Sequence, residues 1–305
     1  MLDISSPLFG IGLLNADPTT KVPPLAVHST FGDSMFISVI MPAFNESLFI
    51  ADNLREVVST FARFGPRFEV ILVDDGSPDN TYRAASEVIR EHPETVRIVR
   101  YDKNKGKGNA LTAGCAFARG SHVVFLDADM DLHPSQLPRF FEIMQESNSD
   151  AVIGSKRHPD SQVRYPLIRK IYSAVYYTMV RILFGLQLRD TQTGLKLFTR
   201  ELLSNVLPRV LSKQFAFDIE VLTIAHRLGY KIVDAPVVLD FSRPRGRIGF
   251  QHIQRIFTDT LAIYYRLRIR KYYDEIHQSI DEMRHDESTR EITTPEDRSQ
   301  PRFSP

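Results

Sequence analysis

Short apolar runs alternate with helical stretches along the middle of this chain, and that alternation limits the folds it can adopt. Four runs are typical of strands buried on both faces: residues 36–41, 68–73, 96–99 and 122–126. Helical patterns follow them at residues 47–63, 79–91, 107–118 and 135–146. This order predicts an α/β fold with a mostly parallel sheet, in which ligands bind beyond the carboxyl ends of the strands.

The pattern continues in the second half of the chain and fades at both ends. A further strand is predicted at residues 150–154, then an aromatic-rich helix at 167–184 and a helix–strand unit at 217–240. Residues 1–34 mix Pro, Gly and Thr without a period, which predicts a weakly ordered lead-in. Residues 277–305 are polar and charged, which predicts a disordered tail.

Three carboxylates follow the fourth predicted strand, in the run FLDADMDL. They belong to Asp127, Asp129 and Asp131, and alternate residues of an extended chain point the same way, so we expect them to converge. Like charges that close repel unless a cation or protons neutralise them. Hard oxygen donors suit Mg²⁺ or Mn²⁺, which complete their coordination with substrate phosphates. The run therefore predicts a divalent metal site, with a turn of solvated acids as the alternative.

Polar turns also end the first two predicted strands. In MPAFNES, Pro42 stops the strand ladder, and Asn45 or Ser47 can cap the next helix. In VDDGSPDNT, Asp74 and Asp75 stand at the carboxyl edge of the strand. Either turn alone is explained as a strand-to-helix connection. Two such turns at the ends of adjacent strands favour a binding site.

A third turn, NKGKGNALTAG, opens the helix after the third strand. Lys105 and Lys107 stand beside the amino end of that helix, where the helix dipole favours an anion such as a diphosphate. The segment is neither a Walker loop nor a full dinucleotide fingerprint, because Leu111 stands where a third glycine would be.

In this order and at these intervals, PAFNE, VDDGSPDNT, NKGKGNAL and DADMDLHP resemble the motifs of glycosyltransferase family 2. These are inverting enzymes of the GT-A fold with a DXD metal motif, and the similarity covers residues 36–245. It implies a catalytic domain at 35–245, in which Asp127 and Asp129 hold a divalent cation on the donor diphosphate and Asp129 serves catalysis. The nucleotide-sugar contacts expected from the resemblance and the lysine-rich turn are Pro42, Ala43, Glu46, Asp74, Asp75, Lys105, Lys107 and Asp127.

Later segments narrow the subfamily. GSKRH, RKIYS and DTQTGLKLFTRE resemble polyprenyl-phosphate sugar synthases, which move one hexose from a nucleotide onto dolichyl or undecaprenyl phosphate. Arg157, Arg169 and Ser173 fall where such enzymes bind the lipid phosphate. Arg169 and Ser173 are four residues apart, so they share one helical face. Each arginine alone is also explained as a solvated surface charge.

Two departures from this subfamily bear on the metal and the donor. Asp131 stands where many of these synthases have glutamine or serine, which leaves its role as a third metal ligand open. Gly106-Lys107-Gly108 replaces the Leu-Gly-Leu-Gly stretch of the dolichyl-phosphate mannose enzymes. With DTQTGLKLF, this favours UDP-glucose as the donor, and GDP-mannose next.

The expected chemistry depends on charge control. A metal across the diphosphate stabilises the negative charge that develops on the leaving nucleotide. An acceptor phosphate has a second pKa of about 6 and is largely ionised at neutral pH, so a strong general base is less necessary than for a sugar hydroxyl. Asp218 and Glu220 in FAFDIE are candidates for a base or positioning acid, and the family resemblance favours Asp218; alternatively, they are acids stabilised by a helix dipole.

A lipid acceptor requires contact with a bilayer. Residues 243–271 hold eight Arg or Lys and one acid among aromatic and aliphatic residues, which predicts a basic amphipathic segment at 246–276 on an anionic membrane surface. The helix at 171–184 is a second candidate, and core packing is the alternative for both. We find no secretory signal and no run of eighteen apolar residues, so we expect a peripheral protein on the cytoplasmic face, held directly or through a membrane-protein partner.

Two other functions stay open at this point. One is a family 2 enzyme that acts on a saccharide or another hydroxyl, and the other is a catalytically silent nucleotide-binding subunit. Nucleic acid is not an expected partner, because the formal net charge of the whole chain is only +1.

Overall fold

The computed structural model describes residues 35–163, 167–214, 216–239, 250–270, 272–274 and 290–292. Its strands are β1 (Phe36–Ala43), β2 (Arg67–Asp74), β3 (Val96–Arg100), β4 (His122–Leu126), β5 (Ala151–Ser155), β6 (Leu195–Thr199), β7 (Ile232–Pro236) and β8 (Arg290–Ile292). Its α-helices are α1 (Ile50–Phe64), α2 (Thr81–Glu91), α3 (Lys107–Phe117), α4 (Leu137–Ser147), α5 (Leu167–Phe184), α6 (Arg200–Val206), α7 (Phe217–Arg227) and α8 (Phe250–Arg268). Short 3₁₀ turns are η2 (Pro134–Gln136), η3 (Leu207–Arg209) and η4 (Tyr272–Asp274).

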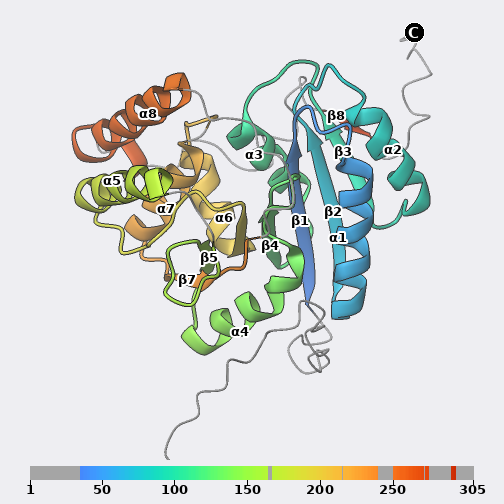
Figure 1. Ribbon diagram of the computed structural model, residues 1–305, viewed down its shortest axis with the longest axis horizontal. Helices are drawn as coiled ribbons and strands as arrows, with labels where there is room; N and C mark the ends of the chain where they lie inside the picture. Colours follow the sequence, from blue (N-terminus) through green and yellow to red (C-terminus); the bar gives the residue numbers. More distant parts are fainter. Residues whose placement is uncertain are drawn as a thin grey trace, which may run out of the picture.

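The described strands form one sheet in the order β7-β5-β6-β4-β1-β2-β3-β8, with helices on both faces (Figure 1). β1 is parallel to β2 and β4, and β2 is parallel to β3. β6 runs antiparallel to both of its neighbours, β4 and β5. The predicted α/β fold with a mostly parallel sheet is confirmed. The strand order reverses between β1 and β4, and such a switch point opens a crevice beyond the strand ends.

Alternate residues of β1 face two separate hydrophobic cores. Val39 and Met41 belong to the core that also contains Leu54 of α1, whereas Ile40 belongs to the other core with Leu111 of α3. Burial of each such side chain contributes about 1.5–3 kcal/mol, so a strand covered on both faces is mostly apolar. This explains why residues 36–41 could be identified as a strand from sequence.

The start of α1 differs from the prediction. The helix begins at Ile50, its N-cap position is Phe49, and no side chain caps it. The expectation that Asn45 or Ser47 would cap it is therefore wrong. The backbone N–H groups of both residues instead donate to side chains of the turn after β2, and Asn45 has a left-handed φ of 60°.

Two strands were not predicted. β6 was missed, and β8 lies within the expected disordered tail, where it pairs antiparallel with β3. This pairing covers an edge of the sheet that would otherwise expose unpaired backbone groups. The expected lead-in at 1–34 and the rest of the tail lie outside the described residues.

Candidate functional site

The turns after β1 and β2 lie side by side at the carboxyl edge of the sheet. The Asp75 N–H donates to the Ala43 carbonyl oxygen over 2.9 Å, and the Glu46 N–H donates to Thr81 Oγ1 over 2.8 Å. Pro42 precedes Ala43 in the same strand. The structure therefore brings together the two turns that the sequence placed at neighbouring strand ends.

Asp74 is fully buried and organises its own turn. Its Oδ1 accepts the Ser77 N–H over 3.0 Å, and its Oδ2 lies 3.0 Å from Arg100 Nε. Burial raises the pKa of Asp74, although the hydrogen bonds from Ser77 oppose that shift. These contacts show that the Asp74 carboxylate stabilises the turn, and its contact with a nucleotide stays a prediction.

Asp75 joins the second turn to the lysine-rich third turn. Its two oxygens accept the N–H groups of Lys105 and Gly106 over 2.7 and 2.8 Å. The N–H groups of Gly108 and Asn109, in the first turn of α3, donate to the Lys213 carbonyl oxygen over 3.0 and 3.4 Å. Because protein oxygens already accept these bonds, the predicted attraction for a diphosphate must come chiefly from the lysine side chains.

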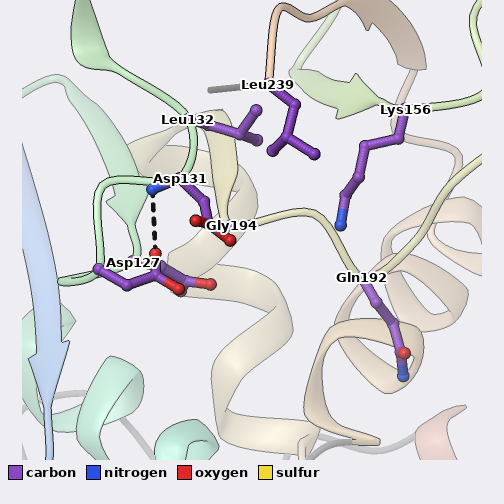
Figure 2. Close-up of a pocket in the computed structure, with 8 residues that line it drawn as sticks. Asp127, Asp131, Leu132, Lys156, Gln192, Gly194 and Leu239 are labelled. Atoms are coloured by element: carbon purple, nitrogen blue, oxygen red, sulfur yellow. Dashed lines mark hydrogen bonds between the residues drawn. The ribbon is translucent and has the colours of Figure 1, made fainter. Parts of the chain in front are cut away.

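The acidic run is a turn, and its predicted geometry was wrong. β4 ends at Leu126, the Met130 N–H donates back to the Asp127 carbonyl oxygen over 3.1 Å, and Met130 has a left-handed φ of 56°. The three carboxylates therefore do not alternate along a strand. They nevertheless line one small open cavity, shown in Figure 2, and the described residues that line it are Asp127, Asp129, Asp131, Leu132, Lys156, Gln192, Gly194 and Leu239.

The pKa values of two carboxylates in this cavity, Asp127 and Asp129, are shifted in opposite directions. Lys107 Nζ lies 2.5 Å from Asp127 Oδ1. Burial alone would raise the pKa of Asp127, but Lys107, with help from more distant lysines, holds it below its ordinary value. The pKa of Asp129 is raised, first by burial and then by repulsion from Asp127 and Asp131. An additional cation at Asp129 would relieve that repulsion.

These residues fit a divalent metal only together with other ligands. Among the described residues, no group of three or more His, Cys, Asp or Glu side chains is placed to hold a metal ion by itself. The hard carboxylate oxygens at the cavity and the excess negative charge at Asp129 still suit Mg²⁺ or Mn²⁺. Substrate phosphates would have to complete the coordination.

Gly194, just before β6, and Lys196 in β6 are site residues that the sequence analysis missed. Gly194 accepts the Asp127 N–H through its carbonyl oxygen over 3.0 Å, and a Cβ at position 194 would lie 2.4 Å from Asp127 Oδ2. Lys196 is buried, with its Nζ 2.9 Å from Asp218 Oδ1. The available signal was the lysine between Leu195 and Leu197, since a charge inside an apolar strand needs a buried partner.

Two further cavity residues, Lys156 and Gln192, were also missed. They belong to GSKRH and DTQTG, which were noticed only as segments. In Figure 2 the ammonium of Lys156 extends toward the space that the carboxylates line. Gln192 Nε2 donates to the hydroxyl of Tyr176 over 3.2 Å, which ties the segment to α5.

Of the three predicted acceptor residues, Arg157 is the one next to a cavity residue in the sequence. Arg157 follows the cavity residue Lys156, and its guanidinium lies 4.5 Å from the centre of the Tyr177 ring. Arg169 and Ser173 lie on α5, as predicted, but their side chains are outside the described part of the structure. Asp218 lies in the first turn of α7, where an acid was expected.

The geometry can be compared with known proteins. Residues 38–207 match the protein family described as Glycosyl transferase family 2. The chain is 29% identical over 229 residues to a dolichyl-phosphate beta-glucosyltransferase of Dictyostelium discoideum, across 71% of this chain and 70% of the relative. It is 31% identical over 257 residues to dolichyl-phosphate beta-glucosyltransferase ALG5A of Trichomonas vaginalis, across 80% of this chain and 78% of the relative.

Solved structures share the fold at lower sequence identity. One is glucosyl-3-phosphoglycerate synthase from Mycobacterium tuberculosis in complex with Mn²⁺, uridine diphosphate and phosphoglyceric acid. It is 21% identical, with a TM-score of 0.61, and the match covers 81% of this chain and 84% of that one.

Proposed function

Because this chain belongs to glycosyltransferase family 2 and has the GT-A fold, we propose that it transfers a hexose from a nucleotide sugar to polyprenyl phosphate. The observation that carries the proposal is the acidic cavity just beyond the end of β4, where Asp127 lines the cavity and pairs with Lys107. The names of the two relatives support a dolichyl-phosphate acceptor and a glucosyl donor. We favour UDP-glucose over GDP-mannose for the same reason.

On the donor side, a divalent cation would be held by Asp127 and Asp129, with Asp131 as a further candidate, and by the donor diphosphate. Such a cation stabilises the charge that develops on the leaving nucleotide. Lys107 supplies a fixed positive charge 2.5 Å from Asp127. The similar structure of glucosyl-3-phosphoglycerate synthase contains Mn²⁺, which supports the use of a divalent cation but does not distinguish Mg²⁺ from Mn²⁺.

On the acceptor side, we propose that Arg157, Arg169 and Ser173 bind the lipid phosphate. Arg157 follows Lys156, which lines the cavity, so a phosphate there would lie close to the bound donor. Guanidinium groups recognise phosphate through two parallel hydrogen bonds. Asp218, held by Lys196, is proposed as the base or the positioning acid for this acceptor.

Helix α8 offers a surface for the membrane. Leu261, Tyr265 and Ile269 recur at intervals of four residues and are 51%, 52% and 66% exposed, with Arg268 and Arg270 also exposed beside them. Apolar side chains among arginines suit an anionic bilayer surface. We propose that this stripe of three residues, the α8 stripe, holds the enzyme on the cytoplasmic face of a membrane, and a membrane-protein partner is a second way of holding it there.

None of the helices in the described part of the chain combines the length and the apolar character needed to span a bilayer.

The acceptor is tested by a comparison of three substrates. Purified protein with Mn²⁺ is incubated with labelled UDP- and GDP-sugars and with vesicles that contain dolichyl phosphate, vesicles that contain dolichol, or a soluble saccharide. The proposal predicts label in the lipid product only with dolichyl phosphate, and less label for the Arg169→Ala/Ser173→Ala variant. Transfer to the saccharide alone would identify a hydroxyl acceptor. No transfer and no donor hydrolysis would indicate a silent nucleotide-binding subunit.

A further inference from the structure

Glu220 in the first turn of α7 is fully buried and has partners on α8 and just after it. Its Oε1 lies 3.0 Å from Arg266 Nη2 of α8 and accepts a hydrogen bond from the hydroxyl of Tyr273 in η4. Arg266 Nε also donates to the Tyr273 hydroxyl over 2.8 Å. A buried carboxylate is stable only when it is paired and hydrogen-bonded, so these contacts fix the end of α8 against α7.

The other oxygen of Glu220 holds a different segment. Oε2 accepts the N–H groups of Leu211 and Ser212 over 3.1 and 2.6 Å. Arg266 also stabilises the segment around Ser212, because its Nη2 donates to Ser212 Oγ over 3.3 Å. One carboxylate therefore bridges α8 and the backbone of the segment at 211–214.

That segment in turn fixes the amino end of α3. The Lys213 carbonyl oxygen accepts the N–H groups of Gly108 and Asn109. The contact is tight, since a Cβ at Gly106 would lie 2.4 Å from the Lys213 oxygen. Lys107 lies between these two glycines and carries the ammonium that meets Asp127. A shift of the 211–214 segment must therefore move the first turn of α3.

We propose that Glu220 is a positioning residue of the donor site, through which the end of α8 fixes the 211–214 segment, the amino end of α3 and the position of Lys107. The ligand that gains from this positioning, a nucleoside diphosphate with its cation, rests on the proposed function. The positioning itself rests on the contacts alone. None of the three side chains of the network, Glu220, Arg266 and Tyr273, lines the cavity, so their effect on the donor is indirect.

The α8 stripe gives this network a further consequence. Leu261 and Tyr265 of the stripe lie on the same helix as Arg266, and Ile269 directly follows that helix, so a bilayer that binds the stripe also favours the α8 position in which Arg266 contacts Glu220. Coupling between two binding sites is reciprocal. Anionic vesicles should therefore strengthen nucleotide binding by the wild-type protein, and should do so less when the network is broken.

The test uses Tyr273→Phe, which removes one hydroxyl and keeps the ring, and Arg266→Gln. Tyr230→Phe is the matched control, because it removes a hydroxyl that accepts a hydrogen bond from Asn205, outside this network. Two properties are measured: amide hydrogen exchange at Gly108 and Asn109, and binding of UDP with Mn²⁺ by calorimetry. Tyr273→Phe removes two hydrogen bonds, one to Glu220 and one from Arg266, and loss of each changes an equilibrium by about threefold to tenfold.

We expect Tyr273→Phe and Arg266→Gln to accelerate exchange at both amides and to weaken UDP binding by that factor, while amides of β1 and β4 keep their protection. The control should change neither property. Unchanged amides at 108 and 109 in Tyr273→Phe, or an equal acceleration throughout the sheet, would overturn the positioning role. If Arg266→Gln fails to fold, the results for Tyr273→Phe alone test the positioning role of Glu220. The exchange measurement needs no donor, so a wild-type protein that binds neither UDP nor GDP would overturn the proposed function and leave the positioning result intact.

Discussion

Lys107 Nζ lies 2.5 Å from Asp127 Oδ1, and this ion pair joins the lysine-rich turn to the acidic run. Burial alone would lower the pKa of Lys107, but Asp127, Asp218 and Asp129 raise it above its ordinary value. The side chain therefore remains an ammonium at neutral pH. A positive charge stands beside the acidic cavity before any donor binds.

The first prediction removes this charge. Lys107→Met keeps much of the side-chain volume, and we expect UDP with Mn²⁺ to bind about tenfold or more weakly, because a charge-assisted contact to the diphosphate is lost. Calorimetric titration measures the change. Lys103→Met, at an exposed lysine of the same turn, serves as the matched control and should bind as the wild-type protein does. Equal affinities for the two variants would contradict the role of Lys107.

The second prediction concerns the close approach of Gly194, just before β6, to Asp127. A Cβ at Gly194 would lie 2.4 Å from Asp127 Oδ2, so Gly194→Ala should displace that carboxylate. We expect transfer activity to fall at least about tenfold, because a misplacement of about 1 Å can cost a hundredfold in rate. Activity assays on the folded variant, checked by circular dichroism, provide the measurement.

Gly229→Ala controls for the general effect of a lost glycine. Gly229 has a φ of 86° and open space around its Cβ position, so the substitution should cost about 1 kcal/mol of stability and leave transfer unchanged. If Gly194→Ala kept full activity, Asp127 would not need its observed position.

The third prediction is a pH dependence of stability. Burial raises the pKa of Asp234 from 3.8 to about 6, and Arg189 only partly offsets this. The unfolded chain loses this proton first, so the contribution of Asp234 to stability falls as the pH rises from about 4 through about 6. Asp234→Asn keeps an acceptor for the Arg189 N–H without the charge. It should raise the free energy of unfolding at pH 7.5 by about 1–3 kcal/mol.

Urea denaturation of both proteins at pH 7.5 and pH 4.5 tests this. The gain from Asp234→Asn should be present at pH 7.5 and absent at pH 4.5, where the native carboxyl group is protonated. A gain of the same size at both pH values would refute the burial argument.

The fourth prediction concerns the α8 stripe. Replacing Leu261, Tyr265 and Ile269 together by glutamine should reduce co-sedimentation with anionic vesicles by about tenfold or more, because each buried apolar side chain contributes about 1.5–3 kcal/mol. Leu228→Gln changes an exposed leucine outside α8 and should sediment as the wild-type protein does. Undiminished sedimentation of the triple variant would place the membrane contact elsewhere on the protein.

Much of the fold could be predicted because it follows from local apolar pattern. Residues 36–41 and 122–126 are apolar except for Ser38 and His122, because both faces of their strands are buried. β6 has the same burial, but Lys196 interrupts its pattern. That lysine is tolerated because Asp218, 22 positions later in the sequence, supplies a counter-charge 2.9 Å away and the Thr193 carbonyl oxygen accepts a hydrogen bond from the ammonium.

The site was predictable in composition and less so in geometry. The motifs identified Asp127 and Lys107, and the structure brings these residues together. The shape of the acidic run depends on the left-handed backbone at Met130. A left-handed residue is usually predicted from a glycine, and this position is a methionine. The Glu220 network joins residues 46 and 53 positions apart, and such long-range contacts leave no periodic signal in a single sequence.

One labelling experiment measures whether the protein transfers a hexose to polyprenyl phosphate and whether that transfer depends on Asp127. Wild-type protein and Asp127→Asn are incubated with radiolabelled UDP-glucose, Mn²⁺ and dolichyl-phosphate vesicles, and the label that enters the lipid phase is counted. The account predicts a labelled, acid-labile glycolipid from the wild-type protein and at least a hundredfold less from Asp127→Asn, about 2.7 kcal/mol of lost transition-state stabilisation. Equal incorporation by the two proteins would contradict it.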